Sequence, residues 1–232
     1  MRLLLLSNSS NHGRGYLDHA MEAVRAFLDG ARRLHFVPFA LHDQAAYTEK
    51  ARARFAREGL EVVGLTADEA GRRALREAEA VFVGGGNTFR LLRALQDSGL
   101  LAALRERAQG GMPFMGASAG TNIAAPTIRT TNDMPIVETR GLDALGLVPF
   151  QINPHYLDPD PASRHMGETR EERLREFLEE NDIPVLGLRE GAWLHLEDGR
   201  GALQGANGAR LFRRGRDPEE RAPGSSIDDL LG

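Results

Sequence analysis

Short apolar runs alternate with amphipathic segments through the first half of the chain. Apolar runs of this length are typical of buried strands, whereas apolar residues recurring every three or four positions indicate helices. The pattern predicts strands at 3–6, 34–37, 61–65, 80–83 and 113–115, and helices at 16–28, 44–58, 66–79, 89–95 and 100–108. Thr66 and Glu69 have the spacing of a capping box for the third helix. Strands separated by helices predict an α/β fold, with a mostly parallel sheet and helices on both faces.

The second half of the chain has a looser pattern. Segments 127–140 and 153–164 are polar and turn-rich. We expect strands at 145–152 and 185–188, a charged helix at 169–181, and a small C-terminal β-hairpin region at 192–207 that turns at Asp198-Gly199. Neither an internal repeat nor a linker divides the sequence. We therefore expect residues 1–232 to form a single α/β domain, with a tail that is mobile from about residue 216.

Composition narrows the function classes. The chain is 41% hydrophobic and 27% charged with a net charge of −4, a balance that does not favour a nucleic-acid partner. Cysteine is absent, which excludes disulfides, thiolate metal sites and cysteine nucleophiles. The four leucines at 3–6 are too few for a secretory signal or a membrane span. We expect a cytoplasmic protein with no membrane partner.

A G-x-S-x-G motif at 116–120 lies between a predicted strand and a helix-like segment. Its glycines permit a sharp turn that raises the hydroxyl of Ser118 above the sheet edge. The backbone N–H of Ala119 would then face the oxyanion formed when Ser118 attacks a carbonyl. The motif predicts a serine nucleophile, although close packing alone also favours small residues at such a turn.

A serine nucleophile needs a base, normally a histidine oriented by a carboxylate. Among seven histidines, His155 directly follows a predicted strand and a proline, and His165 is its nearest competitor in a more polar stretch. Asp133 lies in a polar loop and Glu190 follows another predicted strand. Either carboxylate could orient the imidazole, and the residues alone leave that choice open.

The segment G-G-G-N-T at 84–88 also follows a strand. It lacks the lysine of a P-loop and the spacing of a dinucleotide-binding turn. We therefore interpret the N–H groups of Gly85 or Gly86 as a second oxyanion donor. Metal binding by His155, Asp158, Asp160 and His165 would match no known ligand spacing, so we do not expect a metal site.

Taken together, the motifs at 84–89, 116–122, 131–135, 153–155 and 190–191 closely resemble the peptidase E family of α-aspartyl dipeptidases. The resemblance implies a fold like that of the class I glutamine amidotransferases (flavodoxin-like), with serine in place of their cysteine. It also implies hydrolysis of dipeptides with an N-terminal aspartate, without metal or cofactor. By position, Ser118 would be the nucleophile, His155 the base, and Asp133 or Glu190 the third member. Gly86 and Ala119 would form the oxyanion hole. Ala117 departs from the pattern, because family members can carry a larger residue there.

An aspartate-specific pocket needs a cation or several N–H donors, and arginine binds carboxylates with two parallel hydrogen bonds. Arg170 follows the His155 loop and begins a helix, so we nominate it, with Asn87 and Thr88 as further substrate contacts. A surface arginine paired with glutamates is the alternative for Arg170. For the whole chain, the alternatives are a serine esterase of the α/β-hydrolase type or a non-catalytic small-molecule-binding module. The partner would be a small peptide substrate, bound by a monomer or a homodimer.

Overall fold

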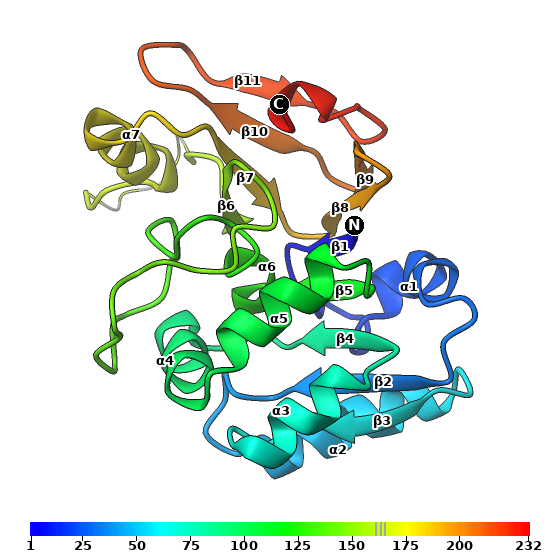
Figure 1. Ribbon diagram of the computed structural model, residues 1–232. Coiled ribbons are helices and arrows are strands. Elements are labelled where there is room, and N and C mark those ends of the chain that lie inside the picture. Colours follow the sequence, from blue (N-terminus) through cyan, green and yellow to red (C-terminus); the bar gives the residue numbers. More distant parts are fainter. Residues whose placement is uncertain (161, 163, 165) are drawn as a thin grey trace.

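In the computed structural model, which describes residues 1–160, 162, 164 and 166–232, seven strands form the larger of two sheets (Figure 1). The strand order is β3-β2-β4-β5-β1-β8-β9, and β1 to β5 pair in parallel while β8 and β9 add an antiparallel hairpin at one edge. These strands are β1 (Arg2–Leu6), β2 (Arg33–Val37), β3 (Glu61–Gly64), β4 (Ala80–Val83), β5 (Phe114–Ala117), β8 (Ala192–Glu197) and β9 (Arg200–Gly205).

Helices cover both faces of this sheet, because its central strands are apolar on both sides. Leu3 and Leu5 of β1 pack into the core beneath α3, α4 and α5, whereas Leu4 and Leu6 pack beneath α1 and α2. The helices are α1 (Met21–Phe27), α2 (Gln44–Ala56), α3 (Glu69–Arg76), α4 (Thr88–Ser98), α5 (Leu100–Gln109) and the short α6 (Ala119–Asn122). The predicted α/β class, a mostly parallel sheet with helices on both faces, is confirmed.

A second, mixed sheet has the order β11-β10-β7-β6, and Figure 1 shows β10 and β11 beside the C-terminus at the top of the view. Its strands are β6 (Gln151–Tyr156), β7 (Val185–Arg189), β10 (Ala209–Phe212) and β11 (Glu219–Arg221). Helix α7 (Arg170–Glu180) packs Leu174 and Leu178 against Tyr156 and Phe212 of this sheet. The sequence predicts the β8–β9 hairpin but not this sheet, whose parallel β6–β7 pair joins strands far apart in the chain.

Three differences from the predicted elements have a clear physical cause. The predicted capping box at Thr66 is wrong, because the carboxylate of Asp68 caps α3 by accepting from Gly71 N, and the Thr66 hydroxyl donates to Asp68. The first helix is shorter than 16–28, since a 3₁₀ turn precedes α1. Residues 145–150 form a bent loop rather than a strand, because the N–H groups of Leu145 and Leu147 bond back to the carbonyls of residues 123 and 124.

The segment after residue 216, expected to be mobile, packs against the rest of the chain. Strand β11 pairs with β10, and the side chains of Ile227 and Leu230 are buried. Arg213 and Arg221 both bind the carboxylate of Asp229. Apolar burial and these ion pairs fix the position of the C-terminal segment.

Candidate active site

Ser118 lies at the sharp turn between β5 and α6, at the carboxyl edge of the larger sheet. Its backbone angles, φ 55° and ψ −113°, are rare for a residue with a side chain. Glycines permit this turn, because a Cβ on Gly116 would lie 2.4 Å from Gly120 O, and one on Gly120 would lie 2.0 Å from Val83 O. The Ser118 N–H donates to Leu6 O at 3.1 Å. The predicted strand–turn–helix context of the motif is therefore present.

His155 lies in β6, the edge strand of the second sheet, where a proline is tolerated. The strand is irregular here, and His155 has a positive φ of 54°. Its N–H donates to Ser7 Oγ at 2.9 Å, and the Ser7 hydroxyl donates to Leu188 O at 2.7 Å. The imidazole Nε2 lies 2.9 Å from Ser118 Oγ. Buried Ser7 thus links the ends of three strands and orients the histidine backbone.

Glu190 follows β7, and its Oε1 lies 2.6 Å from Nδ1 of His155. A carboxylate at Nδ1 favours the tautomer with the proton there, which leaves Nε2 free to accept the Ser118 hydroxyl proton. Backbone contacts hold Glu190 in place: Gly191 N donates to Asn8 Oδ1 at 2.8 Å, and Asn207 Nδ2 donates to Glu190 O at 2.6 Å. The structure thereby brings Ser118, His155 and Glu190 into one row.

Asp133 lies apart from that row, at the N-terminus of α4. Its Oδ2 accepts from Thr88 N at 2.7 Å and from the hydroxyls of Thr88 at 2.6 Å and Thr131 at 3.2 Å. Asn87 is the N-cap of the same helix, with Oδ1 accepting from Arg90 N. Asn87 and Thr88, nominated as substrate contacts, therefore hold the start of α4 and the carboxylate of Asp133.

The residues expected to stabilise an oxyanion lie beside Ser118. Gly85 packs so closely that a Cβ there would lie 3.0 Å from Ser118 Cβ, and Ala119 begins α6 directly after the serine. Gly86 has a φ of +136°, and a Cβ there would lie 2.6 Å from Ala40 O. The bare backbone of Gly85 and Gly86 can approach a reacting carbonyl, which side chains at these positions would block.

Ser118 and His155 lie between two cavities. One, of about 30 Å³, is lined by Asp133, Thr88 and Asn132 among others, and the second, of about 380 Å³, extends toward Tyr47 and Lys50. Arg170, the first residue of α7, lines a neighbouring cavity of about 350 Å³. Burial lowers the pKa of the Arg170 guanidinium, nearby Arg173 lowers it further, and the carboxylate of Asp133 opposes both effects. Arg170 is therefore close enough to Asp133 for the two charges to interact.

Comparison with known proteins identifies the family. The profile of peptidase family S51 matches residues 3–203. The chain is 62% identical to peptidase E from Streptomyces coelicolor (100% of this chain, 95% of the relative) and 48% identical to a probable alpha-aspartyl dipeptidase from Drosophila melanogaster (99% and 97%). The chain belongs to peptidase family S51. The resemblance predicted from the motifs, and with it the class of serine peptidases, is confirmed.

A solved structure also resembles this S51 peptidase in fold. The crystal structure of a peptidase from an acI-B1 actinobacterium superimposes with a TM-score of 0.72, at 17% identity, over 97% of this chain and 96% of that one. Among the described residues, no helix of the S51 chain is long and apolar enough to cross a membrane.

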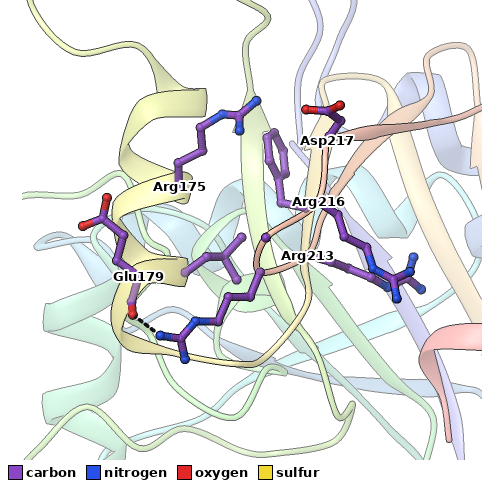
Figure 2. A pocket seen from close by; sticks show the side chains of 9 residues that line it. Arg175, Glu179, Arg213, Arg216 and Asp217 are labelled. Atoms are coloured by element: carbon purple, nitrogen blue, oxygen red, sulfur yellow. Dashed lines mark hydrogen bonds between the residues drawn. The ribbon is translucent and has the colours of Figure 1, made fainter.

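A larger cavity, of about 780 Å³, lies away from the Ser118 row. Figure 2 shows Arg175 and Glu179 of α7 on one side and Arg213, Arg216 and Asp217 of the β10–β11 turn on the other. Neither serine nor histidine lines it, and Arg213 is already paired with Glu219 and Asp229. The size of this cavity therefore does not make it the catalytic site of the S51 peptidase.

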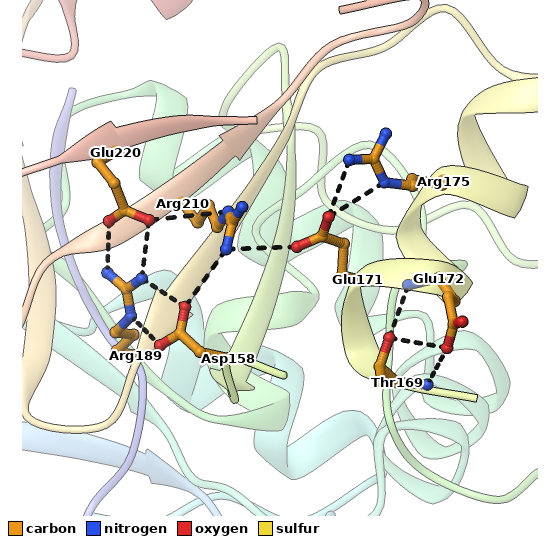
Figure 3. A network of polar contacts seen from close by, with 8 residues as sticks. All are labelled: Asp158, Thr169, Glu171, Glu172, Arg175, Arg189, Arg210 and Glu220. Atoms are coloured by element: carbon orange, nitrogen blue, oxygen red, sulfur yellow. Dashed lines mark hydrogen bonds and ion pairs between the residues drawn. The ribbon is translucent and has the colours of Figure 1, made fainter. Parts of the chain in front are cut away.

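A charged network supports the strand ends that carry His155 and Glu190 (Figure 3). Arg189, adjacent to Glu190, binds Asp158 through two hydrogen bonds of 2.7 and 2.6 Å, and also binds Glu220. The hydrogen bond from Arg189 holds the pKa of Asp158 below its ordinary value. Because Asp158 is three residues after His155, this pair fixes β6 against β7 beside the catalytic row.

The sequence did not predict a positioning role for Ser7, Asn8, Asp158 or Arg189, and Asp158 was considered only as a candidate metal ligand. The signal for Ser7 and Asn8 was their place directly after the first strand, since the carboxyl ends of parallel strands converge. His165, the alternative base, lies outside the described residues. Within the described residues, no group of three or more histidines and carboxylates is arranged to hold a metal ion.

Proposed function

We propose that this S51 peptidase hydrolyses dipeptides with an N-terminal aspartate, through an acyl-enzyme on Ser118. The observation that carries the proposal is the row of Ser118, His155 and Glu190, with contacts of 2.9 and 2.6 Å. The Streptomyces and Drosophila relatives, named peptidase E and probable alpha-aspartyl dipeptidase, support the choice of substrate.

In the proposed reaction, Ser118 Oγ attacks the carbonyl carbon of the aspartyl residue while His155 Nε2 takes the hydroxyl proton. Glu190 stabilises the imidazolium that forms, as the carboxylate of a catalytic triad does. Backbone N–H groups of Ala119 and of Gly85 or Gly86 donate to the oxyanion. The imidazolium then protonates the leaving amine, and a water molecule deprotonated by His155 releases aspartate. This assigns the third triad position to Glu190 rather than Asp133.

The charges around the row suit an aspartyl residue. We assign the side-chain carboxylate of the substrate to Arg170, whose guanidinium is partly buried and near Asp133. Asp133 is held by three donors, and its negative charge beside the small cavity suits the substrate's α-ammonium group. Loss of the Arg170 charge should weaken the preference for aspartyl over alanyl dipeptides, whereas loss of the Asp133 charge should weaken binding of both.

The test is hydrolysis of Asp-Leu and Ala-Leu by the purified protein and by Ser118→Ala, with a chelator present. We expect cleavage of Asp-Leu but not Ala-Leu, and a loss in the variant on the order of 10⁶-fold. Arg170→Ala should reduce the preference for Asp-Leu. Cleavage of short acyl esters without cleavage of Asp-Leu would replace the proposal with an esterase activity, and near-normal turnover by Ser118→Ala would remove Ser118 as nucleophile.

A further inference from the structure

The second cavity beside Ser118 has not been assigned to any part of the substrate in the proposed reaction. Its volume is about 380 Å³, and it runs from Ser118 and His155 to Tyr16, Tyr47 and Lys50. Asp133 and the start of α4 lie on the other side of Ser118, lining the smaller cavity. If the aspartyl residue occupies the Asp133 side, the residue that leaves must occupy this second cavity, which we call the leaving-side cavity.

Lys50 stands out in this protein as its only lysine among 29 lysines and arginines. It projects from the middle of α2, and its Nζ lies 4.5 Å from the centroid of the Tyr16 ring. Arg52 and Arg54 of the same helix are paired with Glu49 and Glu58. By contrast, no carboxylate of the described residues lies within 4.0 Å of the Lys50 ammonium group.

The rest of the leaving-side cavity carries little competing charge. Tyr16 and Tyr47 are almost fully buried, and burial raises the pKa of both phenols, so that both stay neutral near pH 7. Leu41 adds an apolar group to the wall. Asn8, Ser9 and Ser10 complete the lining with neutral polar groups. A cavity with aromatic and apolar walls and one cation that has no carboxylate partner among the described residues is suited to a ligand that has a hydrophobic side chain and a single negative charge.

We propose that Lys50 binds the α-carboxylate of the residue that leaves, so that the leaving-side cavity selects substrates of two residues. This inference rests on the proposed function. In a dipeptide, the carboxylate carbon lies at most roughly 3.8 Å from the scissile carbonyl carbon, from ordinary backbone bond lengths. Lys50 lines the same cavity as Ser118, and its flexible four-carbon stem lets the ammonium group move toward a carboxylate held there. In a longer peptide, a neutral amide would take the place of the carboxylate.

The proposal completes the match of charges between site and substrate. An Asp-Xaa dipeptide carries one ammonium and two carboxylate groups at neutral pH. Of the charged residues that line these cavities, the three that we assign to the substrate are Asp133, Arg170 and Lys50, one negative and two positive. In this assignment, each charge of the substrate has one partner of opposite sign.

The experiment compares Asp-Leu with Asp-Leu-amide, which lacks only the terminal charge, in the wild-type protein and in Lys50→Met. A hydrogen bond to a charged group contributes about 1.5–3 kcal/mol, or about 10- to 150-fold. We therefore expect Lys50→Met to lower kcat/KM for Asp-Leu by at least about tenfold, mainly through KM, and to change kcat/KM for the amide by less than about threefold. Lys50→Arg should restore part of the preference for the free acid.

Arg57→Met is the matched control, because Arg57 follows α2, is exposed and does not line the leaving-side cavity. It should leave the ratio of the two substrates unchanged. An equal loss on both substrates in Lys50→Met, or an unchanged ratio, would overturn the role of Lys50 while leaving the aspartyl dipeptidase activity in place. Failure of the wild-type protein to cleave Asp-Leu would instead overturn the proposed function, and this inference with it.

A chemical test on the wild-type protein is independent of mutation, since the chain has a single lysine side chain. Acetylation removes the charge of Lys50, whereas reductive methylation keeps it, and both reagents also modify the terminal amine. We expect acetylation to abolish the preference for Asp-Leu over its amide and methylation to retain most of it. Equal preferences after the two treatments would contradict the proposal.

Discussion

The two sheets place their catalytic residues by different physical means. In the larger sheet, backbone packing fixes Ser118, since a Cβ on Gly120 would lie 2.0 Å from the carbonyl oxygen of Val83. In the second sheet, side-chain hydrogen bonds between distant segments fix His155 and Glu190. Ser7 binds the backbone of His155, 148 residues away, and Asp158 binds Arg189.

The position of Ser118 therefore depends on residues close to it in the sequence, whereas the positions of His155 and Glu190 depend on residues far from them in the sequence. The turn at Ser118 depends on a few consecutive residues that permit one backbone conformation. The contact of His155 with Glu190 depends on the register of β6 against β7 and on the polar groups that hold both strand ends. Substitutions at the first region should change the backbone, whereas those at the second should change orientation or charge.

The largest expected effect is on catalysis, and it distinguishes the role of Glu190 from that of Asp133. Glu190→Ala should lower kcat for Asp-Leu about 10⁴-fold, because the imidazole loses the carboxylate that orients it and stabilises its charged form. Asp133→Ala should act mainly by raising KM, because Asp133 contacts α4 rather than His155. Steady-state kinetics on both variants measure this split.

The control for this comparison is a double variant, which tests whether the losses of activity at Ser118 and Glu190 add. If Glu190 acts through His155, the double variant Ser118→Ala/Glu190→Ala should be no less active than Ser118→Ala alone. A kcat loss for Asp133→Ala that exceeds the loss for Glu190→Ala would show instead that Asp133 orients the base.

A smaller effect, on stability, is expected from the backbone of the first region. Gly120→Ala places a methyl group against the carbonyl of Val83, and overpacking of this kind costs about 3 kcal/mol or more when backbone atoms must move. Gly59→Ala is the control, since Gly59 has no atom in the way of a Cβ and only a φ of +75°. There, the left-handed backbone conformation alone should cost roughly 1–2 kcal/mol. Urea unfolding of both variants gives the comparison, and equal losses would show that close packing at Gly120 is not limiting.

Sequence patterns predicted the larger sheet and the residues of its catalytic turn. The strands at 3–6 and 80–83 are continuous apolar runs, and the strand at 34–37 is interrupted only by the buried His35, as burial on both faces requires. The G-x-S-x-G motif is equally local. His155 could be nominated because it directly follows an apolar run, although the strand continues through it to Tyr156.

The sequence could not choose between Glu190 and Asp133, because a polar loop and a strand end are both places from which a carboxylate could orient His155. Their difference arises from the β6–β7 pairing and from the donors on Thr88 and Thr131 that hold Asp133. Likewise, Asp68 rather than Thr66 caps α3, since a short sequence offers two plausible caps and packing selects one. Long-range pairing leaves no periodic signal in a single sequence.

The smallest expected effect concerns the ion pair of Asp158 with Arg189, which fixes β6 against β7. The hydrogen bond from Arg189 lowers the pKa of Asp158 in the folded protein. The pair therefore contributes its full stability above the unfolded-state pKa of about 3.9, and loses it as the pH falls through the lower folded-state value. Because the Asp158 side chain is 46% exposed, we expect a contribution of about 1 kcal/mol or less.

Asp158→Asn isolates this contribution from the other carboxylates that titrate in acid. The free energy of unfolding in urea should be lower for the variant than for the wild type at pH 7, and the difference should shrink as the pH falls below about 4, where the wild type also loses the charge. Asp182→Asn is the control, because no ion pair with Asp182 occurs among the described residues, and its difference from the wild type should stay near zero. A difference for Asp158→Asn that is constant from pH 7 to pH 3 would show that hydrogen bonding by the neutral side chain, not charge, holds the two strand ends together.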